Sequence, residues 1–185
     1  DSGSGPPRST DRGRLTERDG QAILRQVSGV SAVAPQIRSS VQLVTPGRSA
    51  TTQATGATPE YGIVSNITAS EGRFLSDSDV GAAARVVVIG QTVADKLFAD
   101  ANPVGETVRI NRVPFKVIGL LESKGSNLGN DNDDQIVVPI TTLRQRLLTT
   151  ATQGPDDVTL LFVGFIDEES LLMGQQEIKR MLRDR

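Results

Sequence analysis

Residues 71–139 alternate short apolar runs with turn residues, and this alternation limits the chain to a mixture of strands and short helices, an α+β fold. The expected elements are a strand at 85–89, a helix at 91–98, a hairpin of 106–110 and 113–121 that turns at Asn111 and Arg112, and a strand at 135–138. Alternation along the second hairpin strand predicts that four residues share one face: Phe115, Val117, Gly119 and Leu121.

The segments on either side of this stretch predict further helices and a long hairpin. Thr16 is a good N-cap for a helix over 16–28, with Asp19 placed as in a capping box and Gly29 suited to end the helix. The other expected elements are extended segments at 30–44 and 49–57, a helix at 141–148, a loop at 149–157, a strand at 157–165 and a helix at 167–185.

The long hairpin turns at Pro46 and Gly47 and has two interpretations. An exposed polar ribbon would offer a surface for pairing with a partner. Alternatively, the two segments are strands of a half-buried sheet, and we favour this interpretation. In either case the tip is a candidate partner contact, which we assign to Thr45, Pro46 and Gly47.

The composition excludes the most common kinds of active site. The chain has no His and no Cys, so it cannot build Ser-His-Asp or Cys-His nucleophile systems, nor zinc, iron or copper sites with those ligands. A net charge of −2, with five Phe, one Tyr and no Trp, gives no basis for binding nucleic acid. Carboxylate and lysine chemistry stay open, but we expect no catalytic residue and no enzyme activity.

Several polar residues are expected to have ordinary structural roles. Asp77 and Asp79 lie in a Ser-rich segment, and we expect both to be exposed rather than an acid–base pair. Arg73 is expected to bind carbonyls or a carboxylate between elements. Tyr61 follows a proline turn and is expected to be a packing residue.

The loop at 124–135 is the most distinctive polar segment. Its clustered Asp and Asn residues could suit Ca²⁺, but the spacing is not that of an EF-hand loop. A phosphate-binding loop is disfavoured by the acidic residues, so we favour a tight loop in which Asp and Asn satisfy local backbone donors. We expect neither metal nor cofactor here. Exposure makes the loop a second candidate partner contact, at Asn127, Asn130 and Asp131.

An ordered set of motifs resembles a known family. In chain order the motifs are GRF (72–74), VVVIG (86–90), NPVG (102–105), FKVIGLL (115–121), KGSNLGNDNDD (124–134) and VVP (137–139). Upstream, LTERDGQAILRQVSGVSAVAP (15–35) and TGATPEYGIVSN (55–66) extend the match. The whole resembles the periplasmic core domain of MacB-type ABC transporter permeases, a group similar to the lipoprotein-releasing permeases, over residues 15–148.

The resemblance implies a two-lobed organisation. Residues 1–14 would be a flexible leader. Residues 15–68 and 152–185, from both chain ends, would form a membrane-proximal, porter-like β-α lobe. Residues 69–151 would form an inserted, membrane-distal α/β lobe. No apolar run approaches the ~20 residues of a transmembrane helix, and a first residue of Asp is expected of an excised or processed fragment.

The resemblance also implies a function. The domain would be non-catalytic and extracytoplasmic, held at the cell inner membrane by flanking helices absent from this sequence, in a permease that forms a homodimer or heterodimer. It would couple ATP-driven change to export through a periplasmic adaptor or carrier protein. ATP would bind a fused or separate ATPase domain, since the chain lacks a GxxxxGK[ST] motif. The alternatives are a free-standing extracytoplasmic ligand- or peptide-binding module and, less favoured, a metal-dependent hydrolase using residues 131–134.

Overall fold

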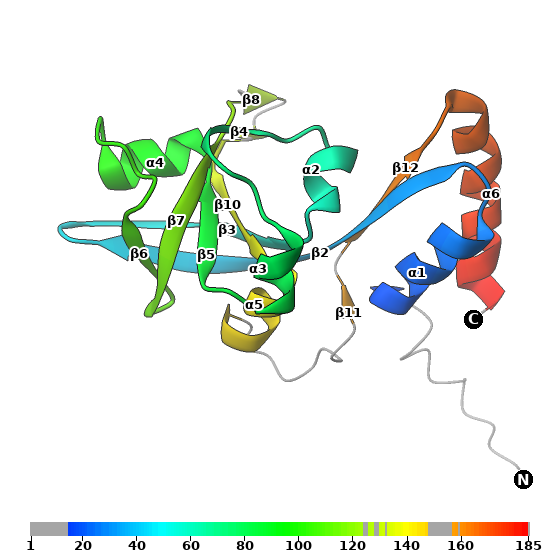
Figure 1. The fold of residues 1–185 in the computed structure, drawn as a ribbon, viewed down its shortest axis with the longest axis horizontal. Coiled ribbons are helices and arrows are strands. Elements are labelled where there is room, and N and C mark those ends of the chain that lie inside the picture. The colour runs from blue at the N-terminus through cyan, green and yellow to red at the C-terminus, as the bar shows by residue number, and fades with distance from the viewer. Residues whose placement is uncertain are drawn as a thin grey trace, which may run out of the picture.

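The computed structural model describes residues 15–123, 126–127, 130–131, 133–147, 157–158 and 160–184. It mixes helices and strands, so the α+β fold class is confirmed (Figure 1). The helices are α1 (Glu17–Gln26), α2 (Glu60–Val64), α3 (Asp77–Gly81), α4 (Gln91–Phe98), α5 (Ile140–Thr142) with its continuation η1 (Leu143–Leu147), and α6 (Glu168–Asp184). The leader predicted at 1–14 and residues 149–156 of the predicted loop lie outside the described residues.

The strands predicted from the sequence are present in the predicted order, and the structure adds strands at Leu15–Thr16, Ala69–Gly72, Ser126–Asn127 and Asn130–Asp131. The described strands are β1 (Leu15–Thr16), β2 (Val30–Thr45), β3 (Arg48–Ala57), β4 (Ala69–Gly72), β5 (Val86–Ile89), β6 (Thr107–Ile110), β7 (Val113–Leu121), β8 (Ser126–Asn127), β9 (Asn130–Asp131), β10 (Gln135–Pro139), β11 (Asp157–Val158) and β12 (Leu160–Phe165). The hairpin predicted to turn at Asn111 and Arg112 is confirmed, as is the turn at Pro46 and Gly47.

Six strands close into a barrel. The second half of β2 pairs with β3, and the ladder continues through β10, β5, β7 and β6. β6 then returns to β2, where Leu43 lies opposite Ile110 and Val44 opposite Arg109. Closure leaves these strands without a free sheet edge over the paired stretch.

The barrel interior is a packed hydrophobic core. Fully buried side chains project into it from every strand of the ring: Ile37, Leu43, Ala54, Val87, Ile89, Ile110, Phe115, Val117, Ile136 and Val138. Leu97 of α4 and Leu143 and Leu147 of η1 belong to the same cluster. The long hairpin is therefore part of a half-buried sheet, and the interpretation as an exposed ribbon is wrong.

One predicted face in this core is wrong. Phe115 and Val117 point inward, but the pairing of β5 with β7 shifts register beyond Val117, so Leu120 joins the interior while Leu121 packs in a second cluster. Gly119 sits at this irregularity because the carbonyl of Arg73 approaches it so closely that a Cβ would clash.

A smaller body is built from the two chain ends. β12 runs antiparallel to the first half of β2, with Val33 opposite Val163. α1 and α6 lie side by side on this pair, at the end of the molecule opposite the β2–β3 tip (Figure 1). The predicted capping of α1 by Thr16 and Asp19 is confirmed, and Gly29 has the expected positive φ of 81°.

A second hydrophobic cluster joins the smaller body to the barrel. We call the barrel, together with β4, α3, α4, α5 and η1, the larger body. Tyr61 of α2 packs against Phe74 and Phe162, with ring centroids 6.4 and 6.1 Å away. Only 5% of Tyr61 is exposed, and burial raises the pKa of its hydroxyl. Its predicted packing role is confirmed.

The two-lobe boundaries stay a prediction. The hydrophobic contacts place Ile37, Val41, Leu43 and Ala54, all before residue 69, in the core of the larger body. β2 thus passes through both bodies, pairing with β12 up to Gln36 and with β3 from Ile37 onward.

Candidate functional site

The two predicted contact regions lie apart. Figure 1 places the β2–β3 tip at one end of the larger body and β8 on another side of it. Ser126–Asn127 and Asn130–Asp131 form a small antiparallel pair, but the side chains of Asn127, Asn130 and Asp131 are outside the described residues. Their role in binding stays a prediction.

The tip residues differ in their exposure. Pro46 and Gly47 are exposed, and Gly47 has a φ of 77°. Thr45 is only 7% exposed, and its hydroxyl donates to the carbonyl of Leu97 at 3.3 Å. The Thr45 side chain therefore connects the tip to α4 by a hydrogen bond. Pro46 and Gly47 stay candidates for contact with a partner.

The structure brings a second turn beside the tip. Exposed residues of the hairpin and of the β6–β7 turn form what we call the tip surface: Gln42, Val44, Pro46, Gly47, Arg109 and Arg112. Two hollows of about 340 and 510 Å³ open there, and Val44 and Arg109 line both. Val44 is 41% exposed, so the surface pairs an apolar centre with cationic neighbours.

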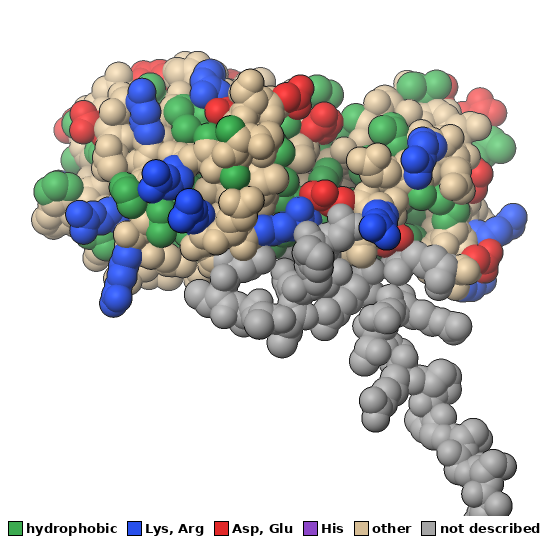
Figure 2. Space-filling model, turned by 60° about the horizontal axis from the view of Figure 1, so that its bottom comes forward, with side chains coloured by type: hydrophobic (Ala, Val, Ile, Leu, Met, Phe, Trp, Pro, Cys, Tyr) green, Lys and Arg blue, Asp and Glu red, His purple; other side chains and the backbone are tan. Residues whose placement is uncertain are grey.

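The arginines of the tip surface are not neutralised. Neither Arg109 nor Arg112 has an acidic partner among the described residues. Figure 2 shows Lys and Arg side chains spread over one face of the larger body, with its acidic side chains near the rim and near the smaller body. An apolar residue beside unpaired guanidinium groups suits a partner that brings carboxylates.

The β6–β7 turn is held in a strained conformation. Asn111 and Arg112 have φ values of 47° and 74°, the pattern of a two-residue turn that favours Asn followed by Gly. Asn111 fits, because its side-chain oxygen accepts from the backbone N–H of Gln42 at 2.9 Å. Arg112 occupies a position where glycine would be less strained. The sequence prediction did not name Arg109 or Arg112 as contact residues. An Arg at the second position of a two-residue turn is unusual, however, and could have indicated Arg112.

We expect Arg112→Gly to stabilise the chain by about 0.5–1 kcal/mol, because it relieves a left-handed φ at an exposed position. Urea denaturation at neutral pH measures this change. Asn111→Gly is the comparison, and should stabilise less because it removes the hydrogen bond to Gln42. Destabilisation by Arg112→Gly would show that the arginine has a structural role.

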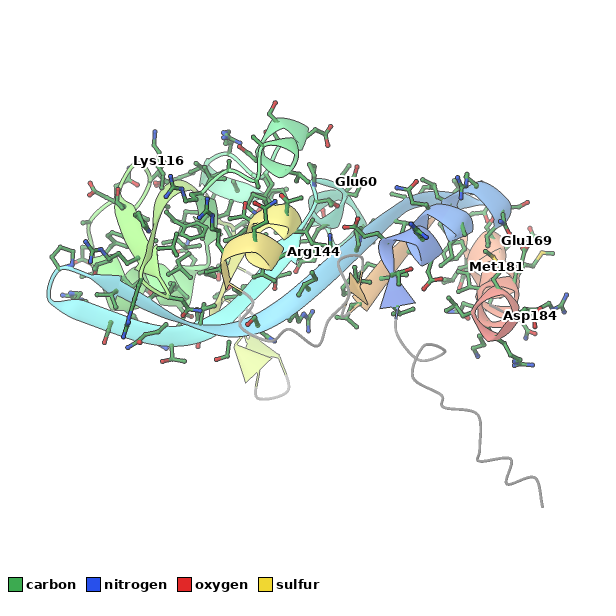
Figure 3. All side chains as sticks on the ribbon, turned by 90° about the horizontal axis from the view of Figure 1, so that it is seen from below. Glu60, Lys116, Arg144, Glu169, Met181 and Asp184 are labelled. Carbon is green, nitrogen blue, oxygen red and sulfur yellow. The ribbon has the colours of Figure 1, made fainter. Side chains whose placement is uncertain are left out.

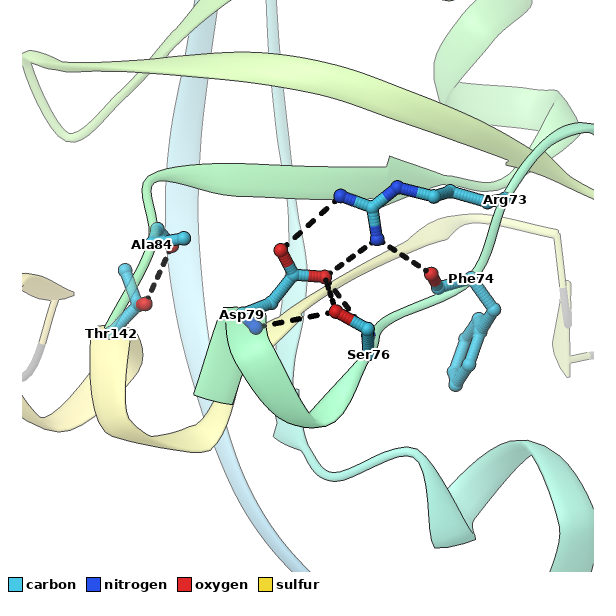
Figure 4. Close-up of polar contacts among 6 residues, drawn as sticks. All are labelled: Arg73, Phe74, Ser76, Asp79, Ala84 and Thr142. Atoms are coloured by element: carbon cyan, nitrogen blue, oxygen red, sulfur yellow. Dashed lines mark hydrogen bonds and ion pairs between the residues drawn. The ribbon is translucent and has the colours of Figure 1, made fainter. Parts of the chain in front are cut away.

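The other polar cluster is structural. Arg73 donates to both carboxylate oxygens of Asp79 at 2.7 and 3.2 Å, and to the carbonyl of Phe74 (Figure 4). Asp79 also accepts from the backbone N–H and the hydroxyl of Ser76, completing the capping box of α3. The predicted role of Arg73 is confirmed, whereas the predicted exposure of Asp79 is wrong because it is 7% exposed.

These contacts stabilise the charged form of Asp79. The hydrogen bond from Arg73 is the main cause that lowers the Asp79 pKa, with smaller contributions from Ser76, and burial opposes them. Nearby, the hydroxyl of Thr142 donates to the carbonyl of Ala84 at 2.7 Å. The cluster therefore joins the GRF motif to α3 and has no group arranged for acid–base chemistry.

Metal binding has no support in the part of the chain that the structure describes. There, no three His, Cys, Asp or Glu residues lie close enough together to hold an ion. Asp133 accepts a hydrogen bond from Ser123 at 2.6 Å, and Asp134 accepts one from Thr52 at 2.8 Å.

Among the described residues, no helix combines the length and apolar character needed to cross a bilayer.

Comparison with known proteins identifies relatives of this fold. The family model for the MacB-like periplasmic core domain matches residues 2–181. The macrolide export ATP-binding/permease protein MacB of Chlorobium luteolum is 39% identical over 135 residues, covering 73% of this chain and 20% of that protein. The protein of the same name from Azoarcus sp. is 33% identical over 185 residues, covering 94% of this chain and 28% of that protein.

Two solved structures share the fold. The periplasmic region of MacB from Actinobacillus actinomycetemcomitans superimposes with a TM-score of 0.77 at 26% identity, covering 92% of this chain and 73% of that one. The extracellular domain of the noncanonic ABC-type transporter YknZ from Gram-positive bacteria gives a TM-score of 0.77 at 23% identity, with coverages of 92% and 83%. The chain thus spans most of each solved domain but between a fifth and a third of the curated relatives compared here.

Proposed function

The chain belongs to the family of MacB-like periplasmic core domains, and on this premise we propose that it couples ATP-driven movement in an ABC transporter permease to export through a periplasmic adaptor or carrier. The observation that carries the proposal is the family match over residues 2–181. The domain itself is proposed to be non-catalytic. ATP would be hydrolysed by another part of the transporter, which works as a homodimer or heterodimer in the inner membrane.

The positions of the described chain ends support a mechanical role. Asp19 and Ala22 of α1 line the same hollow as Leu182 and Asp184 of α6, so these two helices meet beside the points where flanking segments would attach. The tip surface lies at the opposite end of the molecule (Figure 1). Membrane helices attached beside α1 and α6 would therefore act on the end remote from the tip.

β2 connects the two ends as one continuous strand. Its 16 residues extend about 50 Å at ~3.3 Å per residue. It pairs with β12 along its first half and with β3 along its second half, so it is supported over nearly its whole length. A rotation of the smaller body would be carried along β2 and displace the tip surface.

The tip surface is the proposed contact for the adaptor. Arg is enriched at interface residues that contribute most to affinity, and unpaired guanidinium groups beside an exposed Val44 favour an acidic, partly apolar partner. The separate loop at Asn127, Asn130 and Asp131 stays a predicted second contact.

We expect the double variant Arg109→Glu and Arg112→Glu in the full-length permease to weaken adaptor binding at least tenfold, because charge reversal replaces attraction by repulsion. Surface plasmon resonance with purified adaptor at two salt concentrations measures this. Reversal of Arg25 and Arg180, which are exposed on the smaller body, is the charge-matched control and should leave binding unchanged. Equal affinity of the tip variant and the wild type would refute this contact.

A further inference from the structure

The strand β2 changes its neighbour where it passes from one body into the other. It pairs with β12 of the smaller body as far as Gln36, and with β3 of the larger body from Ile37 onward. Among the described residues, no single strand pairs with β2 on both sides of this step. A strand bends most easily where no neighbouring strand continues past the bend, so this step is where β2 is least supported.

The side chain of Gln36 is an unsatisfied polar group at this step. It is 0% exposed, and neither its amide nitrogen nor its amide oxygen forms a hydrogen bond with a described residue. A glutamine amide has four hydrogen-bonding positions, and leaving them unused inside the protein costs free energy. The cost lasts only while the side chain is buried, because water would satisfy the amide if the junction between the two bodies opened.

The surroundings of Gln36 are the apolar contacts that join the bodies. Burial raises the pKa of the Tyr61 hydroxyl and the Gln36 amide opposes that rise, so the two groups lie near each other. They form no hydrogen bond of good geometry, and such a bond would occupy only one of the four amide positions. Tyr61 and Phe162 belong to the second hydrophobic cluster, which links the smaller body to the larger one.

An ion pair also joins the two bodies. Arg144 of η1 donates from Nη1 to Oε1 of Glu17, the first residue of α1, at 3.0 Å. Figure 3 shows Arg144 on the side of the larger body that faces the smaller one. The two side chains are 17% and 32% exposed, so water and salt reach the pair. Glu17 also lines an open groove of about 580 Å³ between α1 on one side and α3 and α5 on the other.

We propose that β2 has a hinge at Gln36 and that the ion pair between Glu17 and Arg144 braces this hinge. With the brace formed, the two bodies move together, and a rotation of the smaller body reaches the tip surface. With the brace broken, the junction opens, the Gln36 amide gains water, and the smaller body moves without displacing the tip surface. The inference rests on the proposed function, because it states what controls the transmission of movement.

The test measures the distance between the two bodies with a pair of spin labels. The chain has no Cys, so Lys116→Cys on β7 and Glu169→Cys on α6 provide one label on each body. Both residues are exposed, and Figure 3 places them on different bodies. Double electron–electron resonance on the 185-residue chain should give one main distance and a small second population from the open junction.

The first variant breaks the brace. Glu17→Gln removes the charge and keeps the size of the side chain, and should increase the second population about threefold, as expected of a partly exposed ion pair. High salt should cause a similar increase in the chain with Glu17 and none in the Glu17→Gln chain. Glu106→Gln removes an exposed carboxylate of the larger body as a matched control, and should change nothing. Unchanged distances in the Glu17→Gln chain would overturn the brace.

The second variant acts on the hinge. Gln36→Leu puts an apolar side chain of similar size in place of the amide, and in the Glu17→Gln chain it should reduce the second population about fivefold. It should also raise the urea midpoint of the chain, whereas most substitutions of buried residues lower the midpoint. Gln53→Leu, at an exposed position of β3, is the control and should leave the distances unchanged.

A lower urea midpoint for Gln36→Leu would overturn the hinge, because it would mean that the amide is hydrogen-bonded in the folded chain. Strong coupling between Gln36→Leu and Tyr61→Phe in a double-mutant cycle would overturn it for the same reason. The proposed function is tested separately, on adaptor binding by the full-length permease with the Arg109 and Arg112 variants. Rigid distances in every labelled chain would therefore leave that result standing, and loss of the adaptor contact would leave the distances interpretable.

Discussion

Phe115→Ala is expected to lower the free energy of unfolding by about 3–5 kcal/mol, the largest effect of any substitution considered for this chain. Phe115 is completely buried inside the six-stranded barrel, on the inner face of β7 and opposite Val108 of β6. Its removal would leave a cavity that the closed ring of strands cannot collapse to fill. Urea denaturation followed by circular dichroism measures the change.

The control for this prediction lies next to it on the same strand. Lys116 is exposed on the outer face of β7, and Lys116→Ala should change stability by no more than about 0.5 kcal/mol. A loss below about 1 kcal/mol for Phe115→Ala would contradict a closed, packed barrel.

Asp79→Ala is expected to cost about 2–3 kcal/mol, the second largest effect. The substitution removes the N-terminal capping box of α3 and the charge-assisted hydrogen bonds from Arg73. The expected cost is moderate because the Arg73 side chain is 52% exposed and water can solvate it after the partner is lost. Asp77→Ala in the same helix turn, with no capping role, should cost much less.

The Asp79 contribution should depend on pH with a definite sign. The Asp79 pKa is lower in the folded chain than in the unfolded chain, mainly because of the hydrogen bond from Arg73. Its stabilisation is therefore complete above the unfolded value of about 4 and is lost as pH falls through the lower, folded pKa. The stability difference between wild type and Asp79→Asn should shrink below about pH 4. A difference that stays constant into strongly acidic solution would contradict this assignment.

Local patterns predicted most elements of the fold. The helix at 91–98 and the turns at Pro46–Gly47 and Asn111–Arg112 depend on nearby residues, and the structure has them where expected. Closure of the barrel was not predicted, because it depends on β6 pairing with β2, more than sixty residues earlier in the chain. Without that contact, the hairpin could be taken for either a ribbon or a sheet.

The errors have the same physical origin. Asp79 was predicted to be exposed because its partner Arg73 lies outside its helix, and local sequence does not reveal that the two side chains pair. The Leu121 face was wrong because the register shift beside Gly119 depends on the approach of the Arg73 backbone. The tip surface joins two hairpins that lie far apart in the chain, so their proximity could not be predicted from local patterns.

Family membership favours the permease domain over the free-standing binding module. The long strand β2, which is shared by the two bodies, is consistent with the proposed transmission of movement between the ends of the domain.

The measurement that tests the central claim most directly is site-specific crosslinking from the tip in living cells. This part of the permease has no cysteine, so Pro46→Cys provides one thiol in it for a benzophenone label. The account predicts a light-dependent adduct with the periplasmic adaptor from Pro46→Cys and none from Gln175→Cys, which is exposed on α6 at the other end. Adaptor adducts from Gln175→Cys alone, in cells that still export, would contradict it.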